Sequence, residues 1–253
     1  MTIDSLKIKE QLGFDCEVEL LETVDSTNLY LKRKDNTYKN TLVVAKSQTA
    51  GKGRCGKNFY SDENGIYMSF LLNKTISSAK VYLLTTTAAV AVAETLNELF
   101  GIDAKIKWVN DIYCNNKKLC GILCEGVLSN EGCYEKSIIG IGINIFKSSF
   151  PADISDIAIS LEDVVEKRKI DRNLIISSVV NKFYDLIHNH SEIYLVEKYK
   201  SLSFMLGKTI TIISADGDYT AKVLDIDNSA QLIIKKQNGE VLSLNSGEIS
   251  IRL

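Results

Sequence analysis

The 253-residue sequence has very little histidine and proline, with 2 His and 1 Pro. Catalysis that depends on a histidine base is therefore nearly excluded. No apolar run approaches the length of a membrane span, and the first residues, MTIDSLKIKEQ, are too polar for a signal peptide. We expect a cytoplasmic protein with no membrane partner.

A large excess of charge of either sign is also missing, because Lys+Arg 30 and Asp+Glu 32 leave a net charge of -2. Such a chain has no general attraction to polyanions, so a broad DNA-binding surface is not expected. Hydrophobic residues make up 45% of the sequence, which is typical of a folded globular protein. Its length indicates one or two domains.

Cysteines are present but follow no disulfide or metal pattern. None forms a C-x-x-C pair, and disulfide frameworks belong mostly to smaller secreted chains. A nucleophilic cysteine would need a histidine base, whereas His188 and His190 both fall near the end of a predicted helix. We interpret as reduced, non-catalytic thiols Cys16, Cys55, Cys114, Cys120, Cys124 and Cys133.

Hydrophobic periodicity predicts a mixture of strands and helices. Strands are expected at 16–24, 41–46, 65–72, 104–109, 118–125 and 133–145. One helix begins near Ala79 and ends at Gly101, and its apolar face is formed by Leu84, Ala88, Val92, Leu96 and Leu99. Asp171 is a suitable N-cap for another helix, with a face of Ile175, Val179, Phe183 and Leu186. Strands in runs favour an α+β fold.

The tail from Gly207 onward has a different pattern. Short strand-like runs alternate with turn pairs such as Asp216-Gly217 and Asn238-Gly239, and Asn-Gly is a strong hairpin signal. We therefore predict a main domain over residues 1–203 and a small β-barrel over 204–253.

The most informative stretch is SQTAGKGRCGKNF, residues 47–59. It contains Gly51, Gly53 and Gly56, and its cations Lys52, Arg54 and Lys57 are not opposed by an acid. Glycines allow successive N–H groups to face an anion, and the cations would neutralise it, so the loop suits a phosphate. A solvated basic loop is the alternative, since neither a Walker A nor a strict G-x-G-x-x-G pattern is present.

Two further segments carry polar residues at strand ends. KWVND at 107–111 is followed by KKLCGILCE at 117–125, and Asn115-Asn116 offers a turn that would bring Lys118 back to Asn110 and Asp111. A surface ion pair would explain the same spacing. IIGIGINI at 138–145 is an apolar strand with two glycines, which indicates close approach of a ligand or of another backbone.

Together with Ser26-Thr27-Asn28, these motifs resemble in order and spacing the biotin–protein ligases, over nearly the whole chain. The resemblance implies a mixed β-sheet with packed helices, the class II synthetase-like catalytic fold, and a small C-terminal SH3-like β-barrel. Only about 25 residues precede Ser26, so we expect the monofunctional form without an N-terminal DNA-binding domain.

The resemblance also implies a reaction and its partners. The carboxylate of biotin attacks the α-phosphate of ATP, pyrophosphate leaves, and biotinyl-5′-AMP then biotinylates one lysine of a biotin carboxyl carrier protein. Mg²⁺ would balance the triphosphate charge as its counter-ion, and no metal site of the protein itself is expected. No DNA partner is expected, and the chain would be a monomer or a weak homodimer.

Residue roles follow from the same resemblance. Lys118 would bridge the biotin carboxylate and the α-phosphate, Arg54 would close over the phosphates, and Asp111 would orient or deprotonate the incoming lysine. The biotin pocket would contain Ser26, Thr27, Gln48, Gly51, Lys52, Gly121 and Leu123. ATP and the adenylate would contact Gly53, Arg54, Lys57, Phe59, Asn110, Lys118 and Asn144.

The sequence departs from the family pattern at several of these positions. Lys52 stands where arginine is usual, Val109 replaces a proline, and Phe59 replaces a tryptophan on the adenine side. No aromatic residue near 158–161 is available to cover the adenine. Loop 51–57 is expected to be mobile until a ligand orders it.

Two alternatives to a biotin ligase remain at this stage. A lipoate–protein ligase shares the fold and the adenylation chemistry, but Gln48 and the Ser26-Thr27 pair suit a ureido ring better than an apolar dithiolane. A non-catalytic sensor of biotin or nucleotide would not need both Lys118 and Arg54.

Overall fold

The computed structural model describes residues 2–34, 39–77, 80–128, 133–147, 150–213, 217–245 and 248–250. Its helices are α1 Ser5–Gln11, α2 Thr27–Arg33, α3 Tyr82–Phe100, α4 Arg172–Asn189 and α5 Glu192–Leu202. Its larger sheet contains β1 Glu17–Val24, β2 Thr41–Gln48, β3 Gly65–Leu72, β4 Ile76–Ser77, β5 Lys105–Lys107, β6 Asp111–Cys114, β7 Lys117–Leu128 and β8 Cys133–Asn144. The second sheet contains β9 Thr209–Ile213, β10 Tyr219–Ile226, β11 Leu232–Lys236, β12 Val241–Leu244 and β13 Glu248–Ser250.

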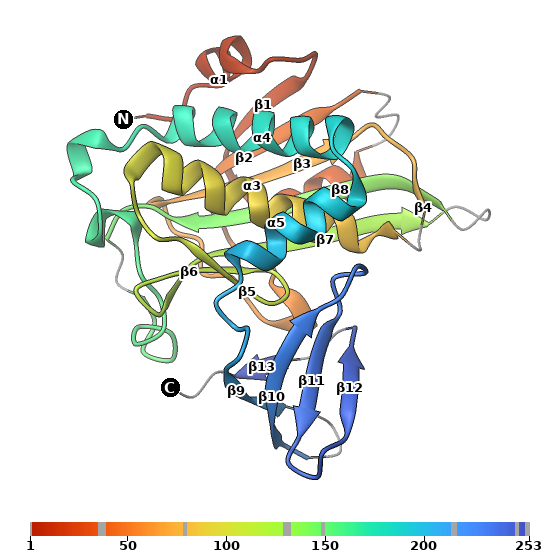
Figure 1. Ribbon diagram of the computed structural model, residues 1–253. Coiled ribbons are helices and arrows are strands. Elements are labelled where there is room, and N and C mark those ends of the chain that lie inside the picture. Colours follow the sequence, from red (N-terminus) through yellow and green to blue (C-terminus); the bar gives the residue numbers. More distant parts are fainter. Residues whose placement is uncertain are drawn as a thin grey trace.

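The larger sheet has the strand order β1-β2-β3-β8-β7-β6-β5, with β4 pairing to β8. β1 and β2 are parallel, and the other pairs are antiparallel, so the predicted mixed sheet is confirmed. In Figure 1, α3, α4 and α5 lie in front of this sheet. The shorter α2 instead packs through Leu31 against Val43, Leu71 and Ile138, which project from the other face.

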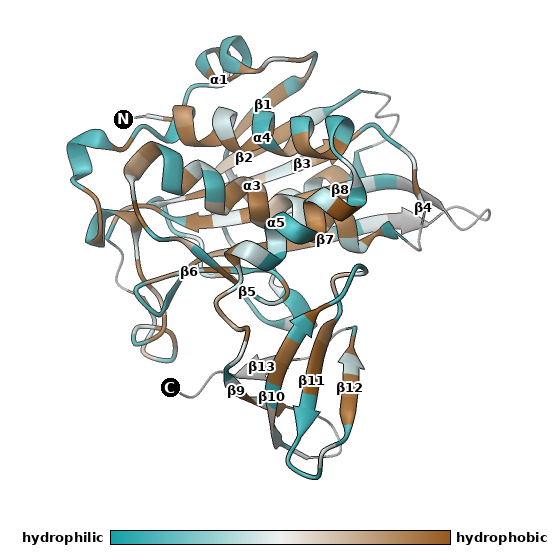
Figure 2. Cartoon of the chain, viewed as in Figure 1, coloured by the Kyte–Doolittle hydropathy of each residue, from teal (hydrophilic) through white to brown (hydrophobic). Residues whose placement is uncertain are grey.

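Helix α3 shows how the sequence builds this core. Leu84, Ala88, Val92 and Leu96 are buried between the sheet and the helices α4 and α5, and Figure 2 shows the apolar residues of α3 against the sheet. The helix ends at Gly101, which takes the left-handed conformation with φ 66°, as its position after the apolar run predicted. Leu99 differs from the expectation, since in the last turn of the helix its side chain is 36% exposed.

The sequence patterns did not predict the short helices. Helices α1 and α2 have only seven residues each, too few for a clear helical period. The predicted strand 104–109 is shorter than expected, because β5 ends at Lys107 and the chain turns before β6 begins at Asp111. The predicted hairpin is present, with Asn115 and Asn116 both at positive φ.

The second sheet is five-stranded and antiparallel, in the order β12-β11-β10-β9-β13, as the turn pairs of the tail predicted. Trp108 connects it to the larger sheet, because its indole Nε1 donates to Ala230 O at 2.8 Å and the ring is buried. The last helix ends at Leu202 and β9 begins at Thr209, so the predicted boundary at residues 203 and 204 lies in this connection. None of the described helices is both long and apolar enough to cross a membrane.

Candidate active site

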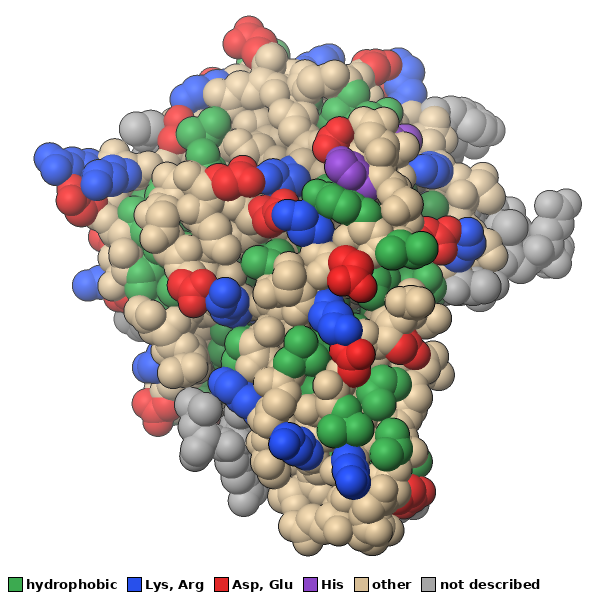
Figure 3. Space-filling view, in the orientation of Figure 1, with side chains coloured by type: hydrophobic (Ala, Val, Ile, Leu, Met, Phe, Trp, Pro, Cys, Tyr) green, Lys and Arg blue, Asp and Glu red, His purple; other side chains and the backbone are tan. Residues whose placement is uncertain are grey.

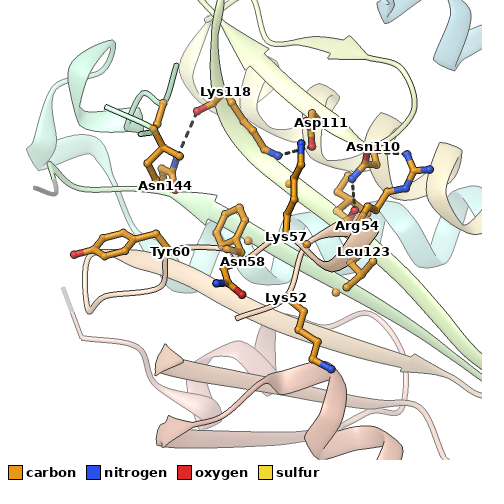
Figure 4. Close-up of a pocket in the computed structure, with 18 of the residues that line it drawn as sticks. Lys52, Arg54, Lys57, Asn58, Tyr60, Asn110, Asp111, Lys118, Leu123 and Asn144 are labelled. Atoms are coloured by element: carbon orange, nitrogen blue, oxygen red, sulfur yellow. Dashed lines mark hydrogen bonds and ion pairs between the residues drawn. The ribbon is translucent and has the colours of Figure 1, made fainter. Parts of the chain in front are cut away.

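A cavity of about 500 Å³ opens on the face of the larger sheet that carries α2. Its floor is the β7–β8 strand pair, and its walls come from loop 51–60, the β6–β7 hairpin and the segment 154–158. Phe204, from the connection between α5 and β9, and Ile213, at the end of β9, add a further edge. Figure 4 shows polar side chains from these separate segments around this space, among them Lys57, Asp111 and Lys118.

The β6–β7 hairpin positions an ion pair inside the cavity. Lys118 Nζ lies 2.7 Å from Asp111 Oδ1, and the two side chains are 29% and 21% exposed. The hairpin predicted from Asn115-Asn116 therefore brings these residues together as expected. Because both groups are only partly hydrated, their charges act on a ligand more strongly than surface charges would.

Loop 51–59 folds into a small hairpin beside this pair. Phe59 N donates to Gly51 O at 2.9 Å and Gly53 N to Lys57 O at 2.7 Å, so the loop closes on itself. Its Arg54 reaches Asn110, with 3.4 Å between Nη1 and Oδ1. Asn110 is itself held by β7, because its Nδ2 donates to Ile122 O at 2.7 Å.

The cations of the loop point in different directions. Figure 4 shows Lys57 extending toward Asp111 and Lys118, whereas Lys52 extends away from them. The charge of Lys52 is instead one of those that lower the pKa of Glu125. Lys52 is thus directed away from Lys57, Asp111 and Lys118.

The opposite end of the cavity is polar but carries little charge. Gln48 Oε1 accepts from the backbone N–H of Thr27 at 2.9 Å and from its hydroxyl at 3.2 Å. Gln48 Nε2 donates to Ser61 Oγ at 3.0 Å. Ser26 is the N-cap residue of α2 and is buried, so its side chain lies at the same end.

Glycines of the floor make room for side chains that cover it. Gly121 and Gly142 face each other in the β7–β8 register, and a Cβ on Gly142 would lie 2.5 Å from the ring of Phe59. A Cβ on Gly140 would lie 2.3 Å from Asn28 Oδ1. The two glycines that the sequence suggested as a place of close approach are therefore covered by Phe59 and Asn28.

A third part of the cavity is formed by the segment after β8. Lys118 N donates to Ile157 O at 2.7 Å and Ile159 N to Lys118 O at 3.0 Å, so this segment runs alongside the start of β7. Asn144 supports it, with Nδ2 donating to Ile159 O at 3.2 Å. Tyr60 and Phe150 form an edge-to-face aromatic pair here, with ring centroids 6.3 Å apart.

Cations outnumber acids among the described lining residues. Lys52, Arg54, Lys57, Lys107 and Lys118 line the cavity, against Asp111 and Asp156. On the face drawn in Figure 3, by contrast, basic and acidic side chains of the described residues are interspersed. Within the cavity, this excess of cations suits a polyphosphate. In the described part of the chain, no group of three or more His, Cys, Asp and Glu residues is placed to hold a metal ion.

Nearly all the residues predicted for the site line this one cavity. They are Ser26, Thr27, Gln48, Lys52, Gly53, Arg54, Lys57, Phe59, Asn110, Asp111, Lys118, Gly121, Leu123 and Asn144. Gly51 is the exception, because it does not line the cavity. It packs against the other strand of its own loop, where a Cβ would be 2.4 Å from Phe59 O. Its absent side chain allows the loop to close.

Several lining residues were not anticipated. Asn28 belonged to a motif used for recognition, but its contacts depend on strands distant in sequence. Tyr60, Phe150 and Phe204 are aromatic residues in loops, where no periodicity marks their direction. Tyr113 lines the cavity too, and burial raises the pKa of its phenol to about 12, so it stays protonated at neutral pH.

The thiols agree with the sequence interpretation where they are described. Cys16, Cys114 and Cys120 are buried, and all three are free. Burial raises the pKa of Cys16 and of Cys124 to about 12, which keeps both protonated. The side chain of Cys133 lies outside the described residues. Cys55 is free, exposed and at the rim of the cavity.

Comparisons with known proteins agree with this geometry. Residues 20–144 match the biotin/lipoate A/B protein ligase family, and residues 205–252 match the biotin protein ligase C-terminal domain. The bifunctional ligase/repressor BirA of Bacillus spizizenii is 36% identical over 225 residues, which are 86% of this chain and 68% of that protein. The biotin–[acetyl-CoA-carboxylase] ligase of Paracoccus denitrificans is 31% identical over 129 residues, covering 50% and 53% of the two chains.

Solved structures extend the likeness to the whole fold. Biotin protein ligase from Aquifex aeolicus in complex with biotin and ATP superposes with a TM-score of 0.74 at 29% identity. The match covers 93% of this chain and 98% of that one, including both sheets. The catalytic fold, the small C-terminal domain and the site motifs therefore agree, and this chain belongs to the biotin–protein ligase family.

Proposed function

We propose that this chain activates biotin with ATP to form biotinyl-5′-AMP and transfers the biotin to one lysine of a carboxylase's biotin carboxyl carrier domain. The observation that carries this function is the set of groups that line one cavity. A polar, nearly uncharged part at Thr27 and Gln48 lies in the same cavity as the Lys118–Asp111 pair and the cations Arg54 and Lys57. A ureido ring, a carboxylate and a triphosphate require these environments together.

Adenylation requires two anions to approach each other. Lys118 Nζ would lie between the biotin carboxylate and the α-phosphate and reduce their repulsion, an effect that is strong in a partly dehydrated site. Arg54 offers a guanidinium that can hold two phosphate oxygens at once, and Asn110 keeps it at the cavity wall. Lys57 adds a further cation on the same side.

The pyrophosphate that leaves would carry its Mg²⁺ with it. Mg²⁺ would arrive bound to the triphosphate, whose charge it balances. Asp111 and Asp156 are the acidic residues among the described lining. Under this proposal, Mg²⁺ enters as part of the substrate.

The adenine would lie at the apolar end of the cavity. The aromatic pair Tyr60 and Phe150 lines that end beside Ile157, close to Asn144. Flat apolar surfaces of this kind suit a nucleobase. These side chains would supply the cover that the sequence around residues 158–161 lacks.

Transfer to the acceptor needs a neutral amine. Asp111 would receive a proton from the incoming lysine once Lys118 has turned to the phosphate, and its position at the cavity wall with partial exposure supports this role. The anhydride bond then breaks as the amide forms, and AMP leaves.

A mass measurement on the acceptor tests the proposal. The protein is incubated with ATP, Mg²⁺, biotin and a biotin carboxyl carrier domain, and the carrier is analysed by intact mass spectrometry. We expect one biotin on one lysine. Lipoyl attachment under matched conditions with lipoate, and none with biotin, would assign the chain to the lipoate branch of the family instead.

A further inference from the structure

A chain of hydrogen bonds runs from the outside of α2 to the polar end of the cavity. Lys32 Nζ lies 2.5 Å from Glu125 Oε1, and Asn28 Nδ2 donates to Glu125 Oε2 at 2.8 Å. Asn28 is only 4% exposed, and it leads on to Ser69 and Thr27. Neither Lys32 nor Glu125 lines the cavity.

We propose that Lys32 and Glu125 are positioning residues which set the direction of these hydrogen bonds, so that Thr27 offers the ligand an acceptor. The ligand must then supply an N–H donor at this point, as a ureido ring does. This role rests on the proposed function, because it concerns how the same cavity selects biotin.

The first step is the orientation of the Asn28 amide. An ionised carboxylate and a backbone carbonyl only accept hydrogen bonds. Asn28 Nδ2 faces both, with Glu125 Oε2 at 2.8 Å and Leu123 O at 3.1 Å, so both of its protons are used. Its Oδ1 is thereby turned to Ser69, and the amide packs against Gly140, where no side chain intervenes.

The second step is the direction of the two hydroxyl groups. Ser69 Oγ is fully buried and lies 2.5 Å from Asn28 Oδ1 and 2.7 Å from Thr27 Oγ1. Ser69 has one proton, and the Asn28 oxygen has none, so the shorter contact takes the Ser69 proton. The Thr27 hydroxyl donates its own proton to Gln48 Oε1 at 3.2 Å.

The third step is what remains for a ligand. With its proton used inside the protein, Thr27 presents a lone pair to the cavity. A ureido N–H satisfies this lone pair, whereas the sulfur atoms of a dithiolane carry no proton to donate. A buried acceptor left without a donor is costly, so the network disfavours the dithiolane.

The charge of Glu125 is consistent with this role. Burial raises the pKa of its carboxyl group, but the hydrogen bonds from Lys32 and Asn28 and the charge of Lys32 outweigh burial and hold the pKa below its usual value. Glu125 is therefore a carboxylate at neutral pH, and it can only accept.

Glu125→Gln tests whether residue 125 must accept the hydrogen bond from Asn28, and not only whether the two side chains are in contact. Lys32 donates only, so it would hold the amide oxygen of the new side chain and leave its NH₂ facing the NH₂ of Asn28. Asn28 would turn over and give up its hydrogen bond to Leu123 O, and the Ser69 proton would move to Thr27 and occupy its lone pair. We expect the KM for biotin to rise about tenfold, with kcat and the KM for ATP unchanged, in biotin-dependent ATP–pyrophosphate exchange.

Rescue provides the decisive comparison. In Lys32→Met/Glu125→Gln the new amide is free to turn its oxygen to Asn28, so the KM for biotin should return most of the way to that of the unaltered protein. If Glu125→Gln alone does not fold, the KM for biotin of this double variant is by itself the test of the role of Glu125. A tenfold raised KM in the double variant, or an unchanged KM in the single one, would overturn the role of Glu125.

A matched control is available on the other side of α2. Glu19 also binds a lysine, Lys34, and a neutral donor, the hydroxyl of Tyr30 at 2.9 Å, and it does not line the cavity. Glu19→Gln should leave the KM for biotin unchanged. If the unaltered protein shows no biotin-dependent exchange at all, the proposed function itself fails, which is a different result from exchange that is insensitive to Glu125.

Discussion

Lys118 and Asp111 form an ion pair between the two strands of the β6–β7 hairpin, with 2.7 Å between the ammonium nitrogen and a carboxylate oxygen. The pair lines the same cavity as Thr27 and the loop cations Arg54 and Lys57. In the absence of substrate the carboxylate stabilises the ammonium. Under the proposed function, the ammonium would turn to the two anionic groups that enter, and the carboxylate would become available to a second amine.

Replacing Lys118 should affect adenylation far more than folding. Lys118→Gln removes the charge that lowers the repulsion between the biotin carboxylate and the α-phosphate, and we expect kcat for pyrophosphate exchange to fall about 10²-fold or more. Because the pair is partly exposed, the thermal midpoint should change little. Lys117→Gln is the control, since Lys117 is the preceding residue of β7 and does not line the cavity. Equal exchange rates in the two variants would contradict the role of Lys118.

Arg54 is expected to retain the intermediate. Its guanidinium is held beside Asn110 at the wall of the cavity, where it would contact phosphate oxygens. In Arg54→Ala the adenylate should leave the site before transfer, so free biotinyl-5′-AMP should accumulate in solution and the KM for ATP should rise. Chromatography of the nucleotides during turnover measures both effects, and an adenylate that stays bound to Arg54→Ala would argue against this role.

The floor of the cavity should tolerate no added methyl group at Gly142. A Cβ there would lie 2.5 Å from the Phe59 ring, so the ring or the strand must move. We expect Gly142→Ala to destabilise the protein by about 1–3 kcal/mol in urea unfolding and to weaken ligand binding. In Gly13→Ala, where the nearest atom to the new Cβ is 3.8 Å away, the unfolding free energy should stay close to that of the unaltered protein. Equal free energies of unfolding for the two variants would show that the Phe59 ring does not pack against Gly142.

Glu125 should contribute to the pH dependence of stability. Its folded-state pKa lies below the usual value because of Lys32 and Asn28, despite the opposing effect of burial. Its contribution is therefore present above the unfolded-state pKa of about 4.3 and is lost as the pH falls through the lower folded-state pKa. The stability difference between the unaltered protein and Glu125→Gln should be constant near neutral pH and should shrink below about pH 4. Urea unfolding at several pH values measures it, and a difference that grows in acid would have the wrong sign.

The sequence predicted those parts of the fold that local pattern specifies. Helix α3, with its apolar period and terminal Gly101, and the hairpin at Asn115-Asn116 are both present. Asn-Gly and Asp-Gly pairs marked the tail as a small antiparallel sheet, as found. The paired position of Lys118 and Asp111 also followed, because only a two-residue turn separates their strands.

Relationships between distant segments were not predictable in this way. The line of bonds from Lys32 through Glu125 to Asn28 joins α2 to β7, about 95 residues away, and depends on strand register. The covering of Gly142 by Phe59 depends on how loop 51–59 folds back over the sheet. The aromatic pair Tyr60 and Phe150 comes from two loops, whose side-chain directions no periodicity reports.

Biotin-dependent exchange of labelled pyrophosphate into ATP tests the central claim most directly, because it requires the cavity to bind biotin and ATP together and to form the anhydride. We predict exchange with biotin, none with lipoate, and a loss of about 10²-fold or more in Lys118→Gln. Exchange with lipoate but not biotin, or biotin-dependent exchange that survives the loss of the Lys118 charge, would contradict the account.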